Sequence, residues 1–184
     1  MDRRLLGAVT LAIATTSVCR AGGQAGAVGR LQSDGAQPIE LSATPVRVAL
    51  NPPGRSAAPD EWSRILSTLA PGRRLVLVLS DLRTDDPPGT LFNVYLNLPE
   101  RVVPGPNDTH LIGSMNYYSV VQARRAEAPG PSPAHERQFD ITSLAQRLFE
   151  GSKMPDAPSV TITPTRPPTA GSRAAIGRIA VVEQ

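Results

Sequence analysis

The chain has 184 residues, among them 19 prolines and 15 glycines, with 19% charged and 4% aromatic residues. This balance argues against a helical bundle and favours a loop-rich β protein of one ordinary domain. The isoelectric point of about 9.6 suggests nucleic-acid binding, but the basic residues are almost all scattered arginines, which argues against that class as well.

The first 21 residues have the layout of a secretory signal peptide. The basic start "MDRR" precedes the apolar run Leu5–Val18 and the small residues of "CRAGGQAGA", and this run is too short for a stable membrane span. Cleavage after Ala21 or after Ala27 fits the pattern. Loss of residues 1–21 removes three arginines and one aspartate, so the net charge falls from +3 to +1. We expect a secreted or periplasmic protein.

Cys19 is the only cysteine of the chain, so no disulfide can form within it. The "TSVC" stretch resembles a lipobox, but Val18 is bulkier than the small residue expected before the cut, which favours cleavage over lipid anchoring. Residues 22–38 are rich in Gly, Ala and Gln and are predicted to be a flexible leader. A single domain is predicted for residues 39–184.

The predicted domain begins with a strand and a helix. Ile39–Leu50 alternates in hydropathy and ends at the breaker "NPPG", which predicts a strand. Residues 59–72 predict a short helix, with Asp60 as its N-cap and Pro71-Gly72 as its end. Its apolar stripe has helical spacing and consists of Trp62, Ile65, Leu66 and Leu69.

Two further strands follow. Arg73–Leu82 is a continuous apolar run, typical of a strand buried on both faces. The turn-rich "RTDDPPG" predicts a β-hairpin from it to "TLFNVYLNLPE", residues 90–100. The latter alternates, with Phe92, Val94, Leu96 and Leu98 on one face and Asn93, Tyr95 and Asn97 on the other. We expect Asn93 and Asn97 to lie on its polar face.

His110–Val121 is the next predicted strand, with Gly113 as a bulge or a point of close approach. On a strand, Tyr117 and Tyr118 point to opposite faces, so at most one packs in the core and the other is presented at the surface. Together with Asn116 they are the candidate contact residues for a protein or a ring-shaped ligand. Simple packing of both tyrosines is the alternative.

A second helix is predicted from the stretch "DITSLAQRLFEG". Ser143 and Gln146 have capping-box spacing, and Gly151 lies where a C-terminal cap belongs. Its apolar stripe comprises Leu144, Ala145 and Leu148, with Ile141 just ahead. Strands are predicted in "APSVTITPT" and "AAIGRIAVVEQ". The elements together predict a mainly β fold, an antiparallel jelly-roll-like β-sandwich or barrel with two short helices.

No catalytic or metal-binding motif is found in the sequence. His110 and His135 belong to no pattern with metal-ligand spacing. The chain also lacks a nucleophile elbow, a phosphate loop and a dinucleotide fingerprint. The acidic residues cluster in turns, which explains them without function, although a hydrolase with a spatially assembled carboxylate pair is a third hypothesis. No catalytic residue, metal or cofactor is predicted.

Five stretches resemble, in order, the C-terminal domain of tyrosinases and plant polyphenol oxidases: "TLFNVYLNLPE", "HLIGSMNYY", "RQFDITSLAQRLF", "SVTITPT" and "AAIGRIAVV". The plant enzymes carry a Lys-Phe-Asp-Val motif where this chain has residues 91–94. Phe92 and Val94 match it, whereas Leu91 and Asn93 depart from it, so an ion pair made there in relatives cannot form in the same way. The "VYLNLPE" form is closer to bacterial tyrosinase-like proteins. The resemblance covers residues 39–184.

The resemblance implies a jelly-roll β-sandwich that packs over a copper domain and shields its active site. A type-3 copper centre takes six histidines, and this chain has two, so the oxidase activity is not expected of it. We expect an exported, non-catalytic binding domain that acts with a type-3 copper oxidase domain on another chain or with another envelope partner. The alternative is an independent carbohydrate- or small-ligand-binding sandwich of the cell envelope. Neither nucleic-acid binding nor a membrane span is expected.

Overall fold

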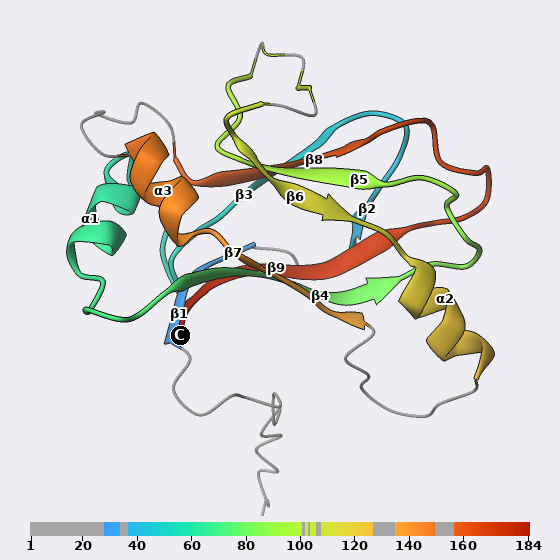
Figure 1. Cartoon of the computed structure of the whole chain (residues 1–184), viewed down its shortest axis with the longest axis horizontal. Coiled ribbons are helices and arrows are strands. Elements are labelled where there is room, and N and C mark those ends of the chain that lie inside the picture. The colour runs from blue at the N-terminus through green and yellow to red at the C-terminus, as the bar shows by residue number, and fades with distance from the viewer. Residues whose placement is uncertain are drawn as a thin grey trace, which may run out of the picture.

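The computed structural model describes residues 28–33, 37–100, 102, 104–105, 108–126, 135–149 and 157–184. These ranges contain nine strands and three helices (Figure 1). The strands are β1 (Val28–Gln32), β2 (Ile39–Glu40), β3 (Val46–Ala49), β4 (Leu75–Arg83), β5 (Phe92–Leu96), β6 (Leu111–Met115), β7 (Arg137–Asp140), β8 (Ser159–Pro164) and β9 (Ala175–Glu183). The helices are α1 (Glu61–Ser67), α2 (Tyr118–Arg125) and α3 (Thr142–Phe149). The expected signal peptide and Cys19 lie outside the described residues.

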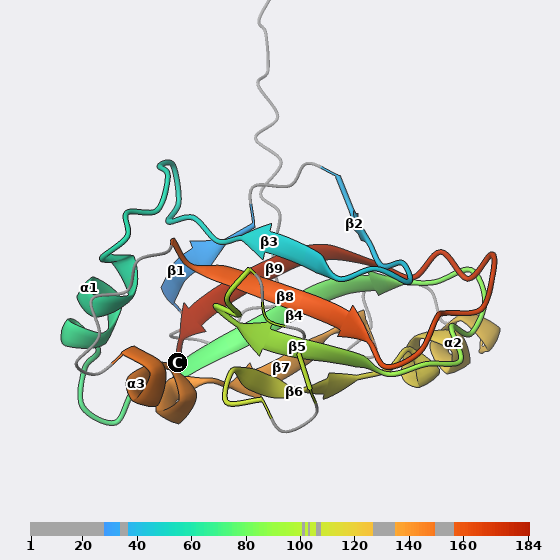
Figure 2. The ribbon, with the colours of Figure 1, turned by 90° about the horizontal axis from the view of Figure 1, so that it is seen from above.

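Two antiparallel sheets face each other (Figures 1 and 2). Sheet A has the order β1-β9-β4-β7, with β2 also paired to β9, and sheet B has the order β3-β8-β5-β6. Most consecutive strands therefore lie in opposite sheets, and β2-β9-β4-β7 against β3-β8-β5-β6 is the strand order of a jelly roll. The expected antiparallel β-sandwich is confirmed, with one helix more than predicted and without barrel closure.

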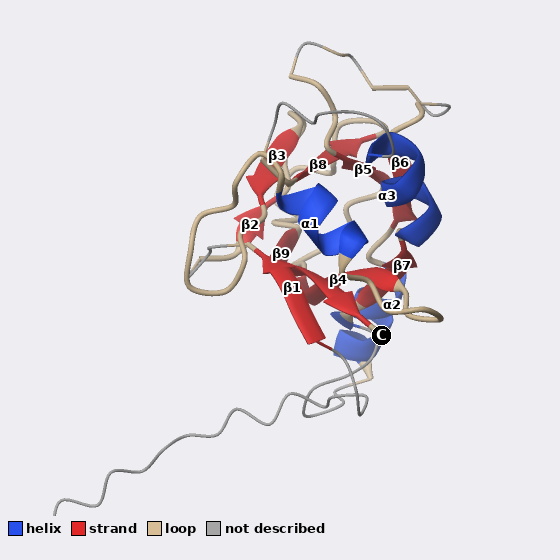
Figure 3. Cartoon of the chain, turned by 90° about the vertical axis from the view of Figure 1, so that its left-hand side faces the viewer, coloured by secondary structure: helices blue, strands red, loops and turns tan. Residues whose placement is uncertain are grey.

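The connections between the sheets gather at the two ends of the sandwich. Helices α1 and α3 cover one end, which Figure 3 shows face-on, and α2 lies at the other. Three crossings meet at the α2 end: residues 84–91 between β4 and β5, α2 between β6 and β7, and residues 165–174 between β8 and β9. Loops at the end of a rigid sandwich are a common place for a binding site.

The predicted hairpin between β4 and β5 is wrong. β4 pairs with β7 and β9, whereas β5 pairs with β6 and β8 in the other sheet. The apolar pattern of two strands that face each other across a core is the same as that of two paired strands, so hydropathy alone does not distinguish the two arrangements.

The leader predicted for residues 22–38 is corrected in its second half, where β1 forms. Val28 pairs with Glu183 and Gln32 pairs with Ala180 of β9, and the Leu31 side chain is 1% exposed. The low local hydropathy of this segment suggested a flexible chain, but the open edge of β9 supplies hydrogen-bond partners that are remote in sequence.

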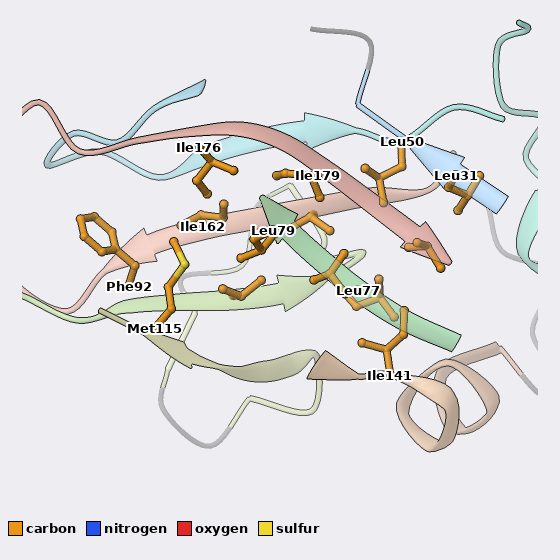
Figure 4. Packing of buried hydrophobic residues seen from close by; sticks show 14 of the residues in the cluster. Leu31, Leu50, Leu77, Leu79, Phe92, Met115, Ile141, Ile162, Ile176 and Ile179 are labelled. Atoms are coloured by element: carbon orange, nitrogen blue, oxygen red, sulfur yellow. The ribbon is translucent and has the colours of Figure 1, made fainter. Parts of the chain in front are cut away.

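The core lies between the sheets (Figure 4). On β4, Leu75, Leu77 and Leu79 are fully buried at every second position, with Val76 also buried on the other face, and the period then shifts, so that Leu82 is the next buried residue. Asp81, with a φ of 58°, produces this shift. It lies beside Gly177, where an added Cβ would be 2.6 Å from the Asp81 Cβ. A side chain at position 177 would therefore collide with Asp81, so glycine is required where β4 and β9 pair at this point.

Helix α1 confirms the predicted stripe: Trp62 and Ile65 are buried, and Leu66 and Leu69 are half-buried. The Trp62 ring stacks on Phe149 of α3, with ring centroids 5.1 Å apart. Asp60 occupies the N-cap position, but its side chain makes no capping hydrogen bond. The predicted helix is confirmed, whereas the expected capping hydrogen bond from Asp60 does not form.

Helix α3 also forms where expected, but a different residue caps it. It begins at Thr142, so Ser143 lies inside the helix and not at its cap. The Asp140 carboxylate instead accepts hydrogen bonds from the Thr142 backbone N–H (3.0 Å) and hydroxyl (2.7 Å). An acidic side chain suits this position because the helix N-terminus carries partial positive charge.

Of the two asparagines expected on the polar face of β5, only Asn93 lies there. Its amide oxygen accepts a 2.6 Å hydrogen bond from the Ser114 hydroxyl. β5 ends at Leu96, and Asn97 takes a φ of 45° and is 5% exposed. Its Oδ1 accepts hydrogen bonds from Trp62 Nε1 (3.3 Å) and the Ser159 backbone N–H (2.8 Å). Asn97 is thus a buried link between α1, β5 and β8.

Candidate functional site

The three candidate contact residues lie at the start of α2 rather than on a strand. β6 ends at Met115, and the chain then turns into α2 at Tyr118. The Asn116 side-chain oxygen accepts a 3.1 Å hydrogen bond from the Tyr118 backbone N–H. The prediction of a strand through Val121 is wrong, because local hydropathy did not separate a strand end from a short helix.

Tyr117 packs in the core. It is 1% exposed, its ring meets that of Phe92 edge-on at 5.8 Å, and its hydroxyl donates to the Ala175 carbonyl at 2.9 Å. Burial raises the pKa of the Tyr117 phenol well above its ordinary value, so the group stays a neutral donor at physiological pH. This side chain fixes the start of α2 against both sheets.

Tyr118 is presented to solvent, with 71% of its surface exposed. The expectation that one tyrosine is packed and the other presented is therefore confirmed, although the cause is a helix start and not strand alternation. A large exposed aromatic side chain held on a fixed backbone is a typical contact residue.

One face of α2 forms a wall of a cleft of about 630 Å³. Tyr118, Val121, Gln122 and Arg125, at helical positions i, i+3, i+4 and i+7, line it. The other residues that line it are Pro87, Pro88, Gly89, Thr90, Leu91, Asn116, Tyr117, Thr165 and Arg166. We call this hollow the α2 cleft.

The inner face of α2 holds the helix in place. Val120 is buried, and Arg124 Nη1 donates to the carbonyls of Thr84 (2.9 Å) and Asp85 (2.7 Å). Ser119 accepts a hydrogen bond from Arg137 of β7. Thr84 and Asp85 belong to the crossing between β4 and β5, and Arg137 belongs to β7 of sheet A, so α2 is fixed both to sheet A and to the crossing that leads into the opposite wall of the cleft.

The opposite wall, Pro87–Leu91, is fixed by hydrogen bonds to the crossing between β8 and β9. The Thr165 backbone N–H donates to the Leu91 carbonyl at 2.9 Å, and Arg166 Nε donates to the Gly89 carbonyl at 2.8 Å. Gly89 has a φ of 67°, a conformation that suits glycine. Two prolines also restrict this wall, so the cleft is formed before any ligand arrives.

The cleft is apolar with a basic rim. Leu91 is 45% exposed and lies in it with Tyr118, so two of the three exposed large hydrophobic side chains of the described residues gather here. Exposed apolar side chains that gather in a hollow indicate a contact surface. The charged side chains in its lining are Arg125 and Arg166; none of the described lining residues is acidic.

Neither histidine lines the α2 cleft. His110 Nδ1 lies 2.8 Å from the Leu96 carbonyl, which fits the structural interpretation made from sequence. His135 lies on the other side of α2, beside Arg124 and Arg173. Among the described residues no three His, Cys, Asp or Glu side chains form a group with metal-binding geometry. No helix in the same ranges is long and apolar enough to cross a membrane.

Sequence reasoning found the tyrosine pair but missed the rest of the cleft. The sequence pattern places Pro87–Gly89 in a hairpin loop and Thr90 and Leu91 at the start of a strand, and it leaves Arg125 and Arg166 among the scattered surface arginines. The spacing of residues 118, 121, 122 and 125 on one helical face was the one local signal available. The predicted strand His110–Val121 hides this spacing, because it covers residues 118 and 121 and ends before residues 122 and 125.

Residues 30–184 match the model of a protein family described as "Domain of unknown function (DUF7868)". No curated protein matches the chain at a significant level.

Several solved structures match the chain. The latent apple tyrosinase has a TM-score of 0.44 and 18% identity, over 80% of this chain and 27% of its own. Recombinantly expressed latent aurone synthase, a polyphenol oxidase, has the same TM-score and identity, over 80% of this chain and 25% of its own. The Cocksfoot mottle virus structure has a TM-score of 0.35 and 9% identity, over 100% of this chain and 94% of its own. This chain therefore spans about a quarter of the apple and aurone synthase chains.

Proposed function

Because the chain belongs to the family described as "Domain of unknown function (DUF7868)", whose description assigns no activity, we propose from its own residues that it is a non-catalytic binding domain of the tyrosinase C-terminal type. It docks through the α2 cleft on a separate protein. That partner is a type-3 copper oxidase domain on another chain or another protein of the cell envelope.

The single observation that carries the proposal is the α2 cleft itself. It combines a rigid hollow, the exposed side chains of Tyr118 and Leu91, and two arginines. Tyrosine and arginine are among the residues that contribute most to protein interfaces, and a fixed surface loses little entropy on binding. The cleft lies at one end of the sandwich, where it is open to a second protein.

The sequence resemblance supports the assignment to the tyrosinase C-terminal type of domain. The motif residues Phe92 and Val94 are buried core residues of β5, so the resembling stretches form the framework rather than a reaction centre. With two histidines in the whole chain, the six-histidine copper centre would have to come from the partner. We therefore propose that the chain itself is not an enzyme.

Export is part of the same proposal. The signal-peptide layout of residues 1–21 would place the mature chain in the periplasm or outside the cell. Amino-terminal sequencing of the mature protein checks this: a start at Gly22 or Val28 agrees with the cleavage sites, and retention of Met1 contradicts them.

A second candidate function is binding of a carbohydrate or another small ligand of the cell envelope. The cleft volume of about 630 Å³ favours it, since small-molecule sites commonly measure roughly 300–1,000 Å³. The presented ring of Tyr118 would then stack on a sugar or an aromatic ring.

The test of docking measures the affinity of the intact chain for a secreted six-histidine copper domain encoded beside it. Tyr118→Ala should weaken binding by about tenfold or more and leave the free energy of unfolding nearly unchanged, since Tyr118 is exposed. Arg147→Gln is the control, because Arg147 is exposed on α3 at the opposite end of the sandwich. Equal affinity of Tyr118→Ala and wild type would refute the cleft as the docking site. Stoichiometric copper in the purified chain alone would refute a non-catalytic role.

A further inference from the structure

We infer that the segment of the partner that enters the α2 cleft carries an apolar side chain flanked by carboxylates. This inference rests on the proposed docking function and specifies the chemistry of the partner. It follows from two observations: the walls of the cleft are apolar, and the two arginines that line it have no acidic partner among the described residues.

The apolar walls of the cleft indicate that the central side chain of the partner segment is apolar. Pro87 and Leu91 form one wall and Val121 and Tyr118 the other, and these groups gain from contact with carbon rather than with water. An apolar side chain inserted between the walls would remove exposed surface of Leu91 and Tyr118 from water on both sides at once.

The two arginines of the cleft carry uncompensated charge. Arg125 is exposed and has no hydrogen-bond or ion-pair partner among the described residues. Arg166 donates to the Gly89 carbonyl, which is uncharged, so its positive charge is retained. No acidic side chain occurs among the described residues that line the cleft. A ligand carboxylate would therefore meet two cations and no like charge.

The acidic residues nearby are mostly engaged by other arginines. Asp85 lies 3.8 Å from Arg124 and 3.7 Å from Arg173, and Asp81 pairs with Arg83 at 2.5 Å. Asp86 shares a smaller neighbouring hollow with Arg125 but does not line the α2 cleft. Among the described residues named here together with Arg166, five arginines stand against three aspartates, so this group carries net positive charge.

Carboxylates suit this rim better than a polyphosphate does. Phosphate recognition in proteins usually brings several donors onto one group, whereas Arg125 belongs to α2 and Arg166 belongs to the crossing between β8 and β9, where it donates to Gly89 of the opposite wall. Two carboxylates separated by an apolar side chain match this arrangement.

The test uses capped tripeptides as probes of the isotope-labelled intact chain. Acetyl-Glu-Phe-Glu-amide is titrated against the neutral acetyl-Gln-Phe-Gln-amide, the cationic acetyl-Lys-Phe-Lys-amide and the truncated acetyl-Glu-Ala-Glu-amide. Backbone amide shifts of Gly89, Leu91 and Gln122 report occupation of the cleft. The Glu-Phe-Glu peptide should bind at least about threefold more tightly than the Gln peptide, since each exposed ion pair is worth up to about 1 kcal/mol. It should also bind more tightly than the Ala peptide, which keeps both carboxylates but lacks the apolar ring that fills the cleft. The Lys peptide should bind most weakly.

Added salt and two variants separate specific from general charge effects. Raising NaCl to 0.5 M should remove most of the preference for Glu over Gln. Arg125→Gln should weaken the Glu-Phe-Glu peptide by about two- to fivefold, and the matched Arg147→Gln should leave it unchanged. Equal binding of the Glu and Gln peptides, equal effects of the two variants, or no shift at the cleft with any peptide would each overturn the inference. Docking of the copper domain, measured separately, would stand or fall independently of these results.

Discussion

Replacing Asn97 with alanine should destabilise the domain far more than replacing Asn93. The change removes the acceptor of two buried donors, Trp62 Nε1 and the Ser159 backbone N–H. An unsatisfied buried donor costs about 1–3 kcal/mol, so the two cost about 2–6 kcal/mol. Alanine is also less tolerant than asparagine of the φ of 45°, which adds about 1 kcal/mol.

One term opposes this loss. The Asn97 amide nitrogen is buried without a hydrogen-bond partner among the described residues, and removing it recovers about 1–3 kcal/mol. With the middle of each range, the net loss in the free energy of unfolding is about 3 kcal/mol. For a domain of this size that lowers Tm by about 6–12 °C. Asn97→Gly should be less damaging by about 1 kcal/mol, because glycine accepts the left-handed conformation.

The assay is urea unfolding followed by the fluorescence of Trp62, which is the single tryptophan of the chain and bonds to Asn97 itself. Near-ultraviolet circular dichroism supplies a second probe that does not depend on quenching. Asn93→Ala is the control and should cost less than about 1 kcal/mol, since Asn93 is half-buried, its partner Ser114 is exposed, and the Tyr95 hydroxyl keeps its hydrogen bond to the Gly105 carbonyl. If Asn97→Ala and Asn93→Ala cost the same small amount, Asn97 lies on the polar face after all and the buried link is refuted.

Three further outcomes are expected. Tyr117→Phe should lower the free energy of unfolding by about 1 kcal/mol through loss of its hydroxyl hydrogen bond, and a neutral result in thermal unfolding would contradict that role. Gly113→Ala should cost about 1–3 kcal/mol, since its Cβ would lie 2.9 Å from the Phe139 ring; a double-mutant cycle with Phe139→Ala must show coupling between them. The hydrogen bond from Arg30, with help from Arg73, holds the pKa of Glu183 below its ordinary value. Its stabilising effect is thus present above the unfolded pKa and lost as the pH falls through the folded one, so Glu183→Gln should flatten the acid limb of the stability profile, and an unchanged limb would disprove it.

The alternating and helical hydropathy patterns determined much of the framework. Phe92, Val94, Leu96 and Leu98 are all buried, as their period of two predicted, and so are Trp62 and Ile65 in α1. Such patterns are local, because burial of one face is the same physical requirement whichever partner covers it. The sandwich class therefore followed from the sequence, while the pairing of β4 and β5 did not.

The candidate site shows the same division. The sequence pointed to Asn116, Tyr117 and Tyr118 because two adjacent tyrosines cannot both be packed on one strand face. It could not supply Pro87–Leu91 or Arg166, which reach the α2 cleft through crossings remote in the chain. Whether an arginine is paired or uncompensated depends on neighbours that only the assembled fold brings near it.

By itself, then, the sequence determined which side chains must leave water and where the chain must turn. The tertiary structure alone decided that β1 completes an edge of sheet A, that Asn97 is buried beneath Trp62, and that three crossings enclose a cleft with a basic rim. The physical reason is that the hydropathy pattern of each segment determines which of its faces is buried. Hydrogen-bond partners, neighbouring charges and clefts instead arise between segments that are distant along the chain.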